Sequence, residues 1–236
     1  MENVIPKVIH YCWFGRNPLP KSAKKCIASW KKYLPTYEIK EWNEDNFDVN
    51  IIPYTRDAYE AKKYAFVSDY ARFWILYHYG GVYFDTDVEV IRSMDDLIEK
   101  GAFMGWEKPN SLGISSIAPG LGLAAPKNHS FYKEILSGFE RLNYYKENGE
   151  RNTYTMIPMV TDMLLQKGLK KDGCMQTIED IIFYPSDYFC PMDAVTGRID
   201  ITSNTHTVHW YTMSWLPKTR QWRVRLMRYI RKFFKK

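Results

Sequence analysis

The sequence lacks the features that mark membrane-spanning, secreted and zinc-stabilised chains. No apolar run in its 236 residues approaches the roughly 18 residues needed to span a bilayer, and Met1-Glu2-Asn3 starts no signal peptide. The four cysteines form no Cys-x-x-Cys pair, which excludes a zinc site or a thioredoxin-like motif built on that spacing. Four thiols without a secretion signal predict reduced cysteines and a cytoplasmic protein.

Acidic residues are absent from the end of the chain. Residues 218–236 hold nine of the 33 Lys and Arg residues and none of the 27 Asp and Glu residues. The rest of the chain therefore has 24 basic and 27 acidic side chains, and its net charge is −3 with His neutral. A body of that sign does not suit a general nucleic-acid binder, so we expect no nucleic-acid partner.

Internal repeats and low-complexity linkers are absent as well. The chain is 45% apolar and 25% charged, as in ordinary globular proteins, and it is long enough to bury a core without disulfides. We therefore expect one domain over residues 1–216 and a basic appendage over residues 217–236.

The predicted elements of that domain alternate between strands and helices. An apolar run at residues 4–15 predicts a buried strand, residues 21–33 predict a helix, and residues 37–42 predict a second strand. This order is typical of an α/β domain with a mostly parallel sheet. Farther along, we expect strands at 102–106, 121–125, 181–185 and 207–210, and helices at 129–141 and 158–167.

Residues 58–79 contain no glycine or proline and predict one helix that stops at Gly80-Gly81. Glycine adopts the left-handed conformation that ends a helix and turns the chain into the next element. An apolar strand begins at Val82 and breaks into acids at Asp85-Thr86-Asp87. The unit therefore reads helix, Gly-Gly turn, strand and Asp-x-Asp.

Asp85 and Asp87 are candidates for a divalent-metal site. Residues i and i+2 of a strand point to the same side, so two carboxylates there repel unless a cation lies between them. Carboxylate oxygens suit Mg²⁺ or Mn²⁺, which commonly complete their ligands with substrate phosphates. The alternative is a solvated turn, but the carboxyl end of a strand is where open α/β sheets bind ligands.

Asp69 and Arg72 lie three residues apart and share one face of the predicted helix. One interpretation is a surface ion pair of little energetic value. The other is a half-buried pair among apolar and aromatic neighbours that presents acceptors and donors to hydroxyl groups. Their spacing leaves both interpretations open. A similar choice applies to His209, which lies in an apolar run and is either a core residue or a ligand.

Four blocks of the sequence resemble the DXD-containing sugar-transferase family. This family includes capsular polysaccharide glycosyltransferases and Och1-type mannosyltransferases, and the large clostridial glucosylating toxins are distant relatives. The blocks follow the family order over residues 5–215, whereas residues 110–200 add little to the resemblance. They are Ile5-Pro6-Lys7-Val8-Ile9-His10-Tyr11-Cys12-Trp13-Phe14-Gly15, Ala65-x-x-Ser68-Asp69-x-x-Arg72, Gly80-Gly81-Val82-Tyr83-Phe84-Asp85-Thr86-Asp87 and His209-Trp210-x-x-x-Ser214-Trp215.

The resemblance implies a GT-A (Rossmann-like) α/β fold, a nucleotide-sugar donor, a Mn²⁺ or Mg²⁺ ion and retention of the anomeric configuration. It implies that Asp69 and Arg72 hold the hydroxyls of the donor sugar, that Asp85 reaches the ribose and the sugar, and that Asp87 binds the metal. The remaining implied residues are Trp13 on the base, His10 in the donor site, His209 on the metal side with His206 as a fallback, and Ser214 and Trp215 near the diphosphate.

The resemblance and the chemistry together predict a retaining, metal-dependent hexosyltransferase of capsule or cell-surface glycan synthesis. We expect a nucleotide sugar as donor, a UDP-sugar before GDP-mannose, and a glycan or lipid-linked acceptor. A cation at Asp87 would stabilise the departing phosphate, and no motif identifies a covalent nucleophile, which favours front-face attack by the acceptor.

The alternative is a non-catalytic nucleotide-sugar-binding or membrane scaffold of the same fold. A haloacid-dehalogenase-type phosphatase fits less well, because Glu89 stands where that motif has Thr or Val. Glu107 is expected at the surface.

The basic appendage predicts an amphipathic helix. An apolar stripe recurs at helical spacing, and Lys and Arg fill much of the rest; the stripe is Trp222, Leu226, Tyr229, Ile230 and Phe233. A basic helix with aromatic residues is typical of a helix lying in a membrane interface, so residues 218–236 predict a peripheral protein on an anionic membrane. The alternative is a helix that packs its apolar stripe on the body.

Overall fold

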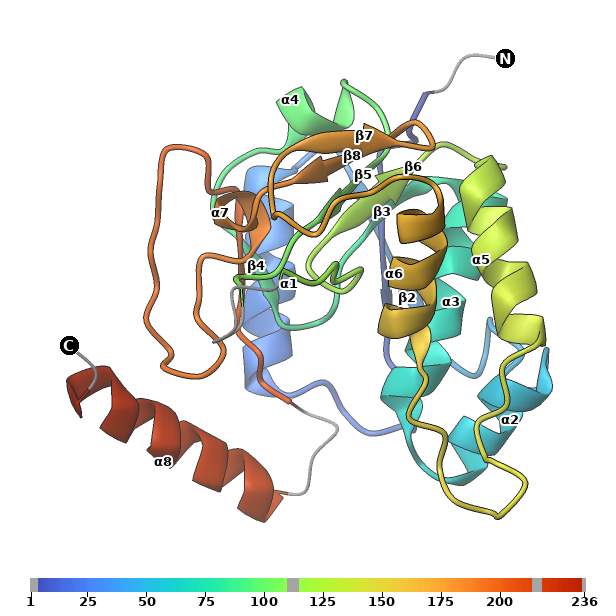
Figure 1. Ribbon diagram of the computed structural model, residues 1–236. Coiled ribbons are helices and arrows are strands. Elements are labelled where there is room, and N and C mark those ends of the chain that lie inside the picture. The colour runs from blue at the N-terminus through green and yellow to red at the C-terminus, as the bar shows by residue number, and fades with distance from the viewer. Residues whose placement is uncertain (1–3, 110–114, 214–217, 235–236) are drawn as a thin grey trace.

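The computed structural model describes residues 4–109, 115–213 and 218–234 (Figure 1). A seven-stranded sheet forms the centre, in the order β2-β1-β3-β6-β5-β8-β7. The pairs β1–β2, β1–β3 and β5–β8 are parallel and the other three pairs are antiparallel, so the sheet is more mixed than the mostly parallel sheet expected. The strands are β1 (Val8–Cys12), β2 (Glu38–Trp42), β3 (Gly81–Tyr83), β5 (Phe103–Gly105), β6 (Leu123–Ala125), β7 (Gln176–Ile178) and β8 (Ile181–Tyr184).

A second, two-stranded sheet joins distant parts of the chain. Strand β4 (Val88–Val90) pairs antiparallel with β9 (Thr207–His209), and Val88 lies opposite His209. This register brings His209 beside the residue that follows Asp87.

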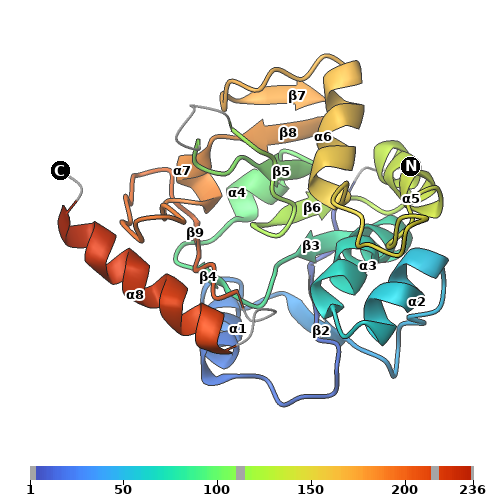
Figure 2. The same cartoon turned by 60° about the horizontal axis from the view of Figure 1, so that its bottom comes forward.

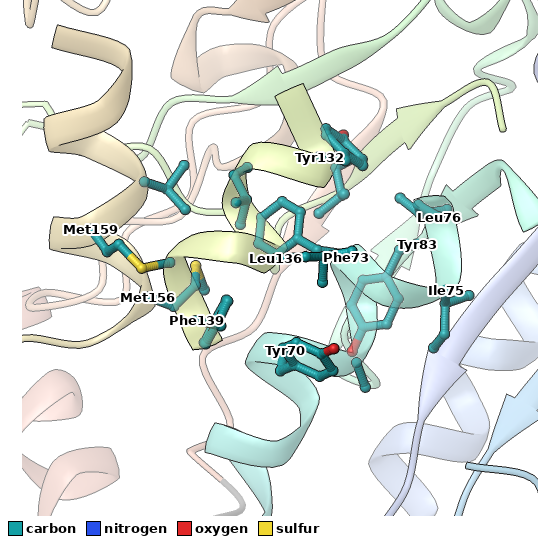
Figure 3. Close-up of a cluster of buried hydrophobic side chains, with 14 of the residues drawn as sticks. Tyr70, Phe73, Ile75, Leu76, Tyr83, Tyr132, Leu136, Phe139, Met156 and Met159 are labelled. Carbon is teal, nitrogen blue, oxygen red and sulfur yellow. The ribbon is translucent and has the colours of Figure 1, made fainter. Parts of the chain in front are cut away.

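Helices cover the two faces of the large sheet and create two cores (Figure 2). One core lies between the sheet and helices α2, α3, α5 and α6, where rings and methionines such as Tyr70, Phe73, Tyr132 and Met159 interlock (Figure 3). The other core is centred on Trp30 of α1. The helices are α1 (Lys21–Tyr33), α2 (Pro53–Glu60), α3 (Tyr64–Tyr79), α4 (Asp95–Ile98), α5 (Ser130–Glu140), α6 (Met156–Gln166), α7 (Ser186–Phe189) and α8 (Lys218–Phe234).

The helix expected over residues 58–79 is two helices, α2 and α3, with a break between them. Lys62 adopts a left-handed φ of 55°, and its neighbour Lys63 donates its backbone N–H back to the Ala58 carbonyl at 2.8 Å. This bond closes α2 and turns the chain into α3. The predicted stop at glycine is confirmed, because Gly80 follows α3 with a φ of 66°.

The basic appendage forms α8, a helix that lies to one side of the body (Figures 1 and 2). Its contact with the body includes Arg228, whose Nε donates to the Ala194 carbonyl at 2.9 Å and whose Nη1 donates to the Tyr211 carbonyl at 3.1 Å. None of the helices in the described ranges combines the length and the apolar composition that a membrane crossing requires.

Candidate active site

Asp85 and Asp87 lie in a turn between β3 and β4. The Val88 N–H donates to the Asp85 carbonyl at 3.0 Å, which closes the turn, so the two acids are not the i and i+2 residues of a straight strand as expected. They still lie at the carboxyl end of β3, beside the end of the parallel strand β1. The charge of Asp87 contributes to raising the pKa of Asp85, after the larger effect of burial, so the two carboxylates interact.

Arg72 joins the two acidic motifs. Its Nη2 lies 3.1 Å from Asp69 Oδ1 and 3.2 Å from Asp85 Oδ1, so α3 and the turn after β3 meet at one guanidinium. The Arg72 side chain is 5% exposed and that of Asp69 is 19% exposed, which excludes the surface-pair interpretation. Burial raises the pKa of Asp69 to about 6, although the Arg72 charge opposes the shift.

Asp85 is held from three sides. Besides Arg72, the Tyr83 hydroxyl donates to Asp85 Oδ1 at 3.1 Å, and the Asp85 N–H donates to the Gly120 carbonyl at 3.2 Å. A β-carbon on Gly120 would overlap Asp85 Oδ2 and would lie 3.2 Å from Arg72 Nη1. Only glycine therefore leaves room for the Asp85 carboxylate in this position. The sequence pattern did not identify Gly120 because the contact joins residues 35 positions apart.

Asp87 is held by the segment that follows β9. The Thr212 N–H and hydroxyl donate to Asp87 Oδ2 at 2.7 and 3.0 Å, and His209 Nε2 lies 3.1 Å from Asp87 Oδ1. Burial alone would raise the pKa of Asp87, but His209 and Thr212 outweigh it and hold that pKa well below its usual range. Burial lowers the pKa of His209, but Asp87, Asp85 and Glu107 together outweigh this effect, so the net shift is upward. The structure thus brings His209 to Asp87, and the role of the two residues as metal ligands stays a prediction.

Glu107 also belongs to this cluster, contrary to its expected place at the surface. It follows β5, accepts a hydrogen bond from the Tyr211 hydroxyl at 3.1 Å, and its charge acts on His209. Burial raises the pKa of Glu107, against the opposing effects of His209 and Tyr211. The available sequence signal was its position directly after a strand, the same signal that marks Asp85.

The charges of the site fit a bound cation. Four carboxylates gather around one arginine and one histidine, and these carboxylates are Asp69, Asp85, Asp87 and Glu107. Asp87 offers oxygen and His209 offers nitrogen, ligands that suit Mn²⁺. No group of three or more His, Cys, Asp or Glu in the described ranges is placed to hold a metal alone, so the remaining ligands would come from elsewhere, as phosphates provide for Mg²⁺.

His10 does not join the cluster, and its assignment to the donor site is corrected. The ring is 2% exposed, Nε2 lies 3.0 Å from the Gly80 carbonyl, and Nδ1 accepts a hydrogen bond from Trp42 Nε1 at 3.0 Å. Burial lowers the pKa of His10 to about 4, so the ring is neutral at pH 7. Its role is to tie β1 and β2 to the Gly-Gly turn.

The other predicted residues divide between the site and its surroundings. Trp13 is half-buried just after β1, and its Nε1 donates to the Asn17 carbonyl at 2.6 Å. His206, the fallback for His209, lies instead with Nδ1 2.6 Å from the Ser93 carbonyl and stacks near Tyr188, so that fallback is wrong. Ser214 and Trp215 lie outside the described residues.

Comparison with known protein sequences finds similarity to glycosyltransferases, in agreement with the DXD motif. Residues 20–104 match the family described as the glycosyltransferase sugar-binding region containing the DXD motif. Inositol phosphoceramide mannosyltransferase 3 of Schizosaccharomyces pombe is 30% identical over 147 residues, which cover 60% of this chain and 39% of that protein. Mannosyl phosphorylinositol ceramide synthase SUR1 of Saccharomyces cerevisiae is 30% identical over 164 residues, which cover 68% and 39%. The chain thus spans about two fifths of the length of these relatives.

Solved structures confirm the expected GT-A fold. The PaToxG glycosyltransferase superposes with a TM-score of 0.52 at 20% identity and covers 70% of this chain and 71% of its own. A glycosyltransferase involved in glycosylation of the major capsid of PBCV-1 superposes with a TM-score of 0.54 at 12% identity, covering 93% and 100%. At these identities the likeness is one of fold.

Proposed function

Because the chain belongs to the DXD-motif sugar transferases, we propose that it is a retaining, metal-dependent glycosyltransferase. Its donor is a nucleotide sugar that carries a hexose, with UDP-sugars favoured and GDP-mannose kept in the test because relatives are named as mannosyltransferases. Its acceptor is a lipid-linked or polysaccharide glycan of the cell surface, such as capsule. The observation that carries this proposal is the single guanidinium, Arg72, shared by Asp69 and by Asp85 of the DXD motif.

The Asp69–Arg72–Asp85 group is suited to hold a sugar. A guanidinium offers several fixed donors and carboxylates offer acceptors, and both are needed to bind neighbouring hydroxyls. Because Tyr83 and Gly120 also fix Asp85, the carboxylate oxygens that would accept hydrogen bonds from the sugar are in position before the nucleotide sugar binds. Preorganised charges of this kind favour a sugar ring that becomes positive as its bond to phosphate breaks.

Asp87 and His209 are suited to hold the cation. A divalent ion bound there would supply Lewis-acid stabilisation of the negative charge on the departing diphosphate. His209 and, after it, Thr212 lower the pKa of Asp87, so this carboxylate carries the negative charge that a bound cation requires. The acceptor hydroxyl would attack the sugar C1 from the face of the leaving group as the bond from C1 to the diphosphate breaks, and its proton would pass to the departing phosphate oxygen. We expect no glycosyl-enzyme adduct in mass spectrometry.

The test is metal-dependent hydrolysis of a panel of donors: UDP-glucose, UDP-galactose, their N-acetyl forms and GDP-mannose. We expect one donor to be cleaved with Mn²⁺ and not with EDTA, and Asp87→Ala to reduce the rate on the order of 100-fold or more. Asp45→Ala is the matched control, because Asp45 pairs with Arg16 at the surface. Binding without cleavage would favour the non-catalytic scaffold, and full activity of Asp87→Ala would refute the proposed role of the DXD motif.

We further propose that α8 lies on an anionic membrane, which would make the protein peripheral on the cytoplasmic side. Four residues of the predicted apolar stripe are exposed: Trp222 at 67%, Tyr229 at 65%, and Leu226 and Ile230 at 39% each. Arginines flank the stripe, and a helix with these two properties binds anionic lipid surfaces.

A further inference from the structure

A cavity of about 300 Å³ lies beneath α8, outside the cluster of carboxylates. Its walls come from α1, from the segment after β9 and from the inner side of α8. Most of the wall is apolar, and the side chains that provide it are Cys26, Trp210, Tyr211, Met213 and Val224. A space of this size and character is within the range of small-molecule sites.

Hydrogen bonds and ion pairs hold two walls of the cavity in place. Glu89 accepts a hydrogen bond from Trp210 Nε1 at 2.8 Å and lies 3.3 Å from Lys25 Nζ, so one carboxylate fixes side chains from the β9 segment and α1. Arg228 donates to the Tyr211 carbonyl and secures α8 over the opening. The cavity is therefore built into the protein and does not need a ligand to form.

The cavity adjoins the candidate active site through two lining residues, Tyr211 and Thr212, and the Tyr211 hydroxyl donates to Glu107 at 3.1 Å. Thr212 lines the cavity and also donates its N–H and its hydroxyl to Asp87. A molecule in the cavity thus lies on the opposite side of Thr212 from the carboxylate that we propose to hold the cation. This position suits the part of an acceptor that does not react.

The charges of the cavity select among ligands. Among its described lining residues, Lys25 and Arg228 are cationic and none is acidic, and Glu89, outside the lining, pairs with Lys25 at 3.3 Å. The polar lining groups are otherwise neutral, as in Ser22 and Gln221. An apolar space with cations in its wall suits an amphiphile that has an alkyl or isoprenoid chain and an anionic group.

We propose that this cavity binds the lipid chain and the adjoining phosphate of a lipid-linked acceptor. The helix that forms one wall of the cavity also exposes Trp222 and Tyr229, so the cavity adjoins the element that we propose to contact the membrane. The proposal rests on the proposed glycosyltransferase function and names the acceptor class for the same site.

The first test measures binding of octyl, decyl and dodecyl phosphate below their critical micelle concentrations, by calorimetry on the full chain. Each added methylene should strengthen binding by up to roughly fourfold while the cavity fills. Val224→Trp blocks the cavity from α8, and Ser22→Trp blocks it from α1; each should weaken dodecyl phosphate binding on the order of tenfold. Leu226→Trp is the matched control, because this residue lies on the exposed side of α8.

The second test separates the acceptor from bulk lipid and from the donor. With a donor that the wild-type protein hydrolyses, Val224→Trp should keep the hydrolysis rate and lose transfer to a lipid-phosphate-linked sugar, while transfer to the same sugar without its chain stays unchanged. Lys25→Gln should weaken dodecyl phosphate more than dodecanol.

Three outcomes overturn the proposal. Equal binding of dodecyl phosphate by Val224→Trp, Ser22→Trp and wild-type protein would place the amphiphile elsewhere. Unchanged transfer to the lipid-linked acceptor by both blocking variants would show that the cavity holds only bulk lipid. Loss of donor hydrolysis in a folded Val224→Trp protein would assign the space to the donor. Failure of the wild-type protein to cleave any donor would instead count against the proposed function.

Discussion

At the scale of single residues, the site depends on charged groups whose burial lowers the stability of the folded protein. Arg72 is buried between two carboxylates, and Asp69 has a pKa raised by burial. A carboxylate that resists ionisation is useful only where a ligand compensates, so residues of this kind mark function more than stability.

Gly120 gives the first residue-scale prediction. Gly120→Ala places a methyl group against Asp85 and should lower both stability and donor hydrolysis, because the carboxylate must leave Arg72. We expect a loss of about 1–3 kcal/mol in the free energy of unfolding, measured with urea. In an Asp85→Ala background the same substitution should cost much less, since the overlapping atoms are gone. Equal costs in both backgrounds would disprove this contact.

Asp69 gives a prediction about pH. Burial raises its folded pKa to about 6, above the ordinary value of 3.8, so its protonated form favours the fold. That contribution is fully present below pH 3.8 and is lost as the pH rises through about 6. Relative to Asp69→Asn, the wild-type protein should therefore lose free energy of unfolding between pH 4 and pH 7, by up to about 3 kcal/mol.

The control for this pH effect is Asp45→Asn. Asp45 and its partner Arg16 are both largely exposed, so this variant should follow the wild-type pH profile. A difference between wild-type protein and Asp69→Asn that does not change with pH would count against the buried carboxylate as its cause.

At the scale of elements, strand β4 places Asp87, and α1 protects the edge of β4 that β9 leaves open. Ser29 Oγ accepts the Val90 N–H at 2.9 Å, and Trp30 Nε1 donates to the Val88 carbonyl at 2.8 Å. Side chains of α1 thus make the hydrogen bonds that a neighbouring strand would make with β4. This keeps the open edge of β4 from pairing with another chain.

Ser29→Ala tests this arrangement. It leaves the Val90 N–H without its acceptor next to a buried strand, and should cost about 1–3 kcal/mol of unfolding free energy. Because β4 follows Asp87 directly, the KM for the donor should rise as well. Ser29→Thr keeps the hydroxyl and should restore both values; failure to do so would point to packing as the cause.

The sequence predicted the elements around the site well, because local signals mark them. Gly80 and Gly81 end α3, and the strand of Val82 and Tyr83 leads to Asp85 as expected. The break at Lys62 was missed because lysine carries no signal for a left-handed φ. The contacts of Gly120 and Glu107 were missed because they join strands far apart in the chain, and a single sequence does not state which strands are neighbours.

His10 and His209 show why residue roles needed the structure. Both follow a β-branched residue within a strand, and the sequence resemblance assigns both to the site. Hydrogen-bond partners decide between them: His10 bonds Gly80 and Trp42 in the core, whereas His209 bonds Asp87. A pattern of residue types does not record which way a ring points.

At the scale of the whole molecule, the positive charge is concentrated in one helix beside an acidic body. The last 19 residues carry nine positive charges, and the exposed rings of Trp222 and Tyr229 share that helix. A molecule with this charge distribution is expected to orient its C-terminal helix toward an anionic surface.

Vesicle binding tests this asymmetry. Binding to vesicles that contain anionic lipid should weaken as salt rises from 50 to 500 mM, because the Debye length falls from about 13 Å to about 4 Å. At any one salt concentration, Trp222→Ala/Tyr229→Ala should bind more weakly than the wild-type protein. Tyr145→Ala/Tyr154→Ala is the matched control, since these tyrosines are exposed on the body. Equal binding by the two double variants would rule out α8 as the contact.

The pairing of Asp87 with Thr212 has a consequence for synthesis of the chain. The partners lie 125 residues apart, and His209 lies 122 residues from Asp87. A nascent chain on the ribosome acquires Asp69, Arg72 and Asp85 early, whereas His209 and Thr212 are added 122 and 125 residues after Asp87. We expect the proposed cation site to stay incomplete until that later segment has been made and has paired with Asp87.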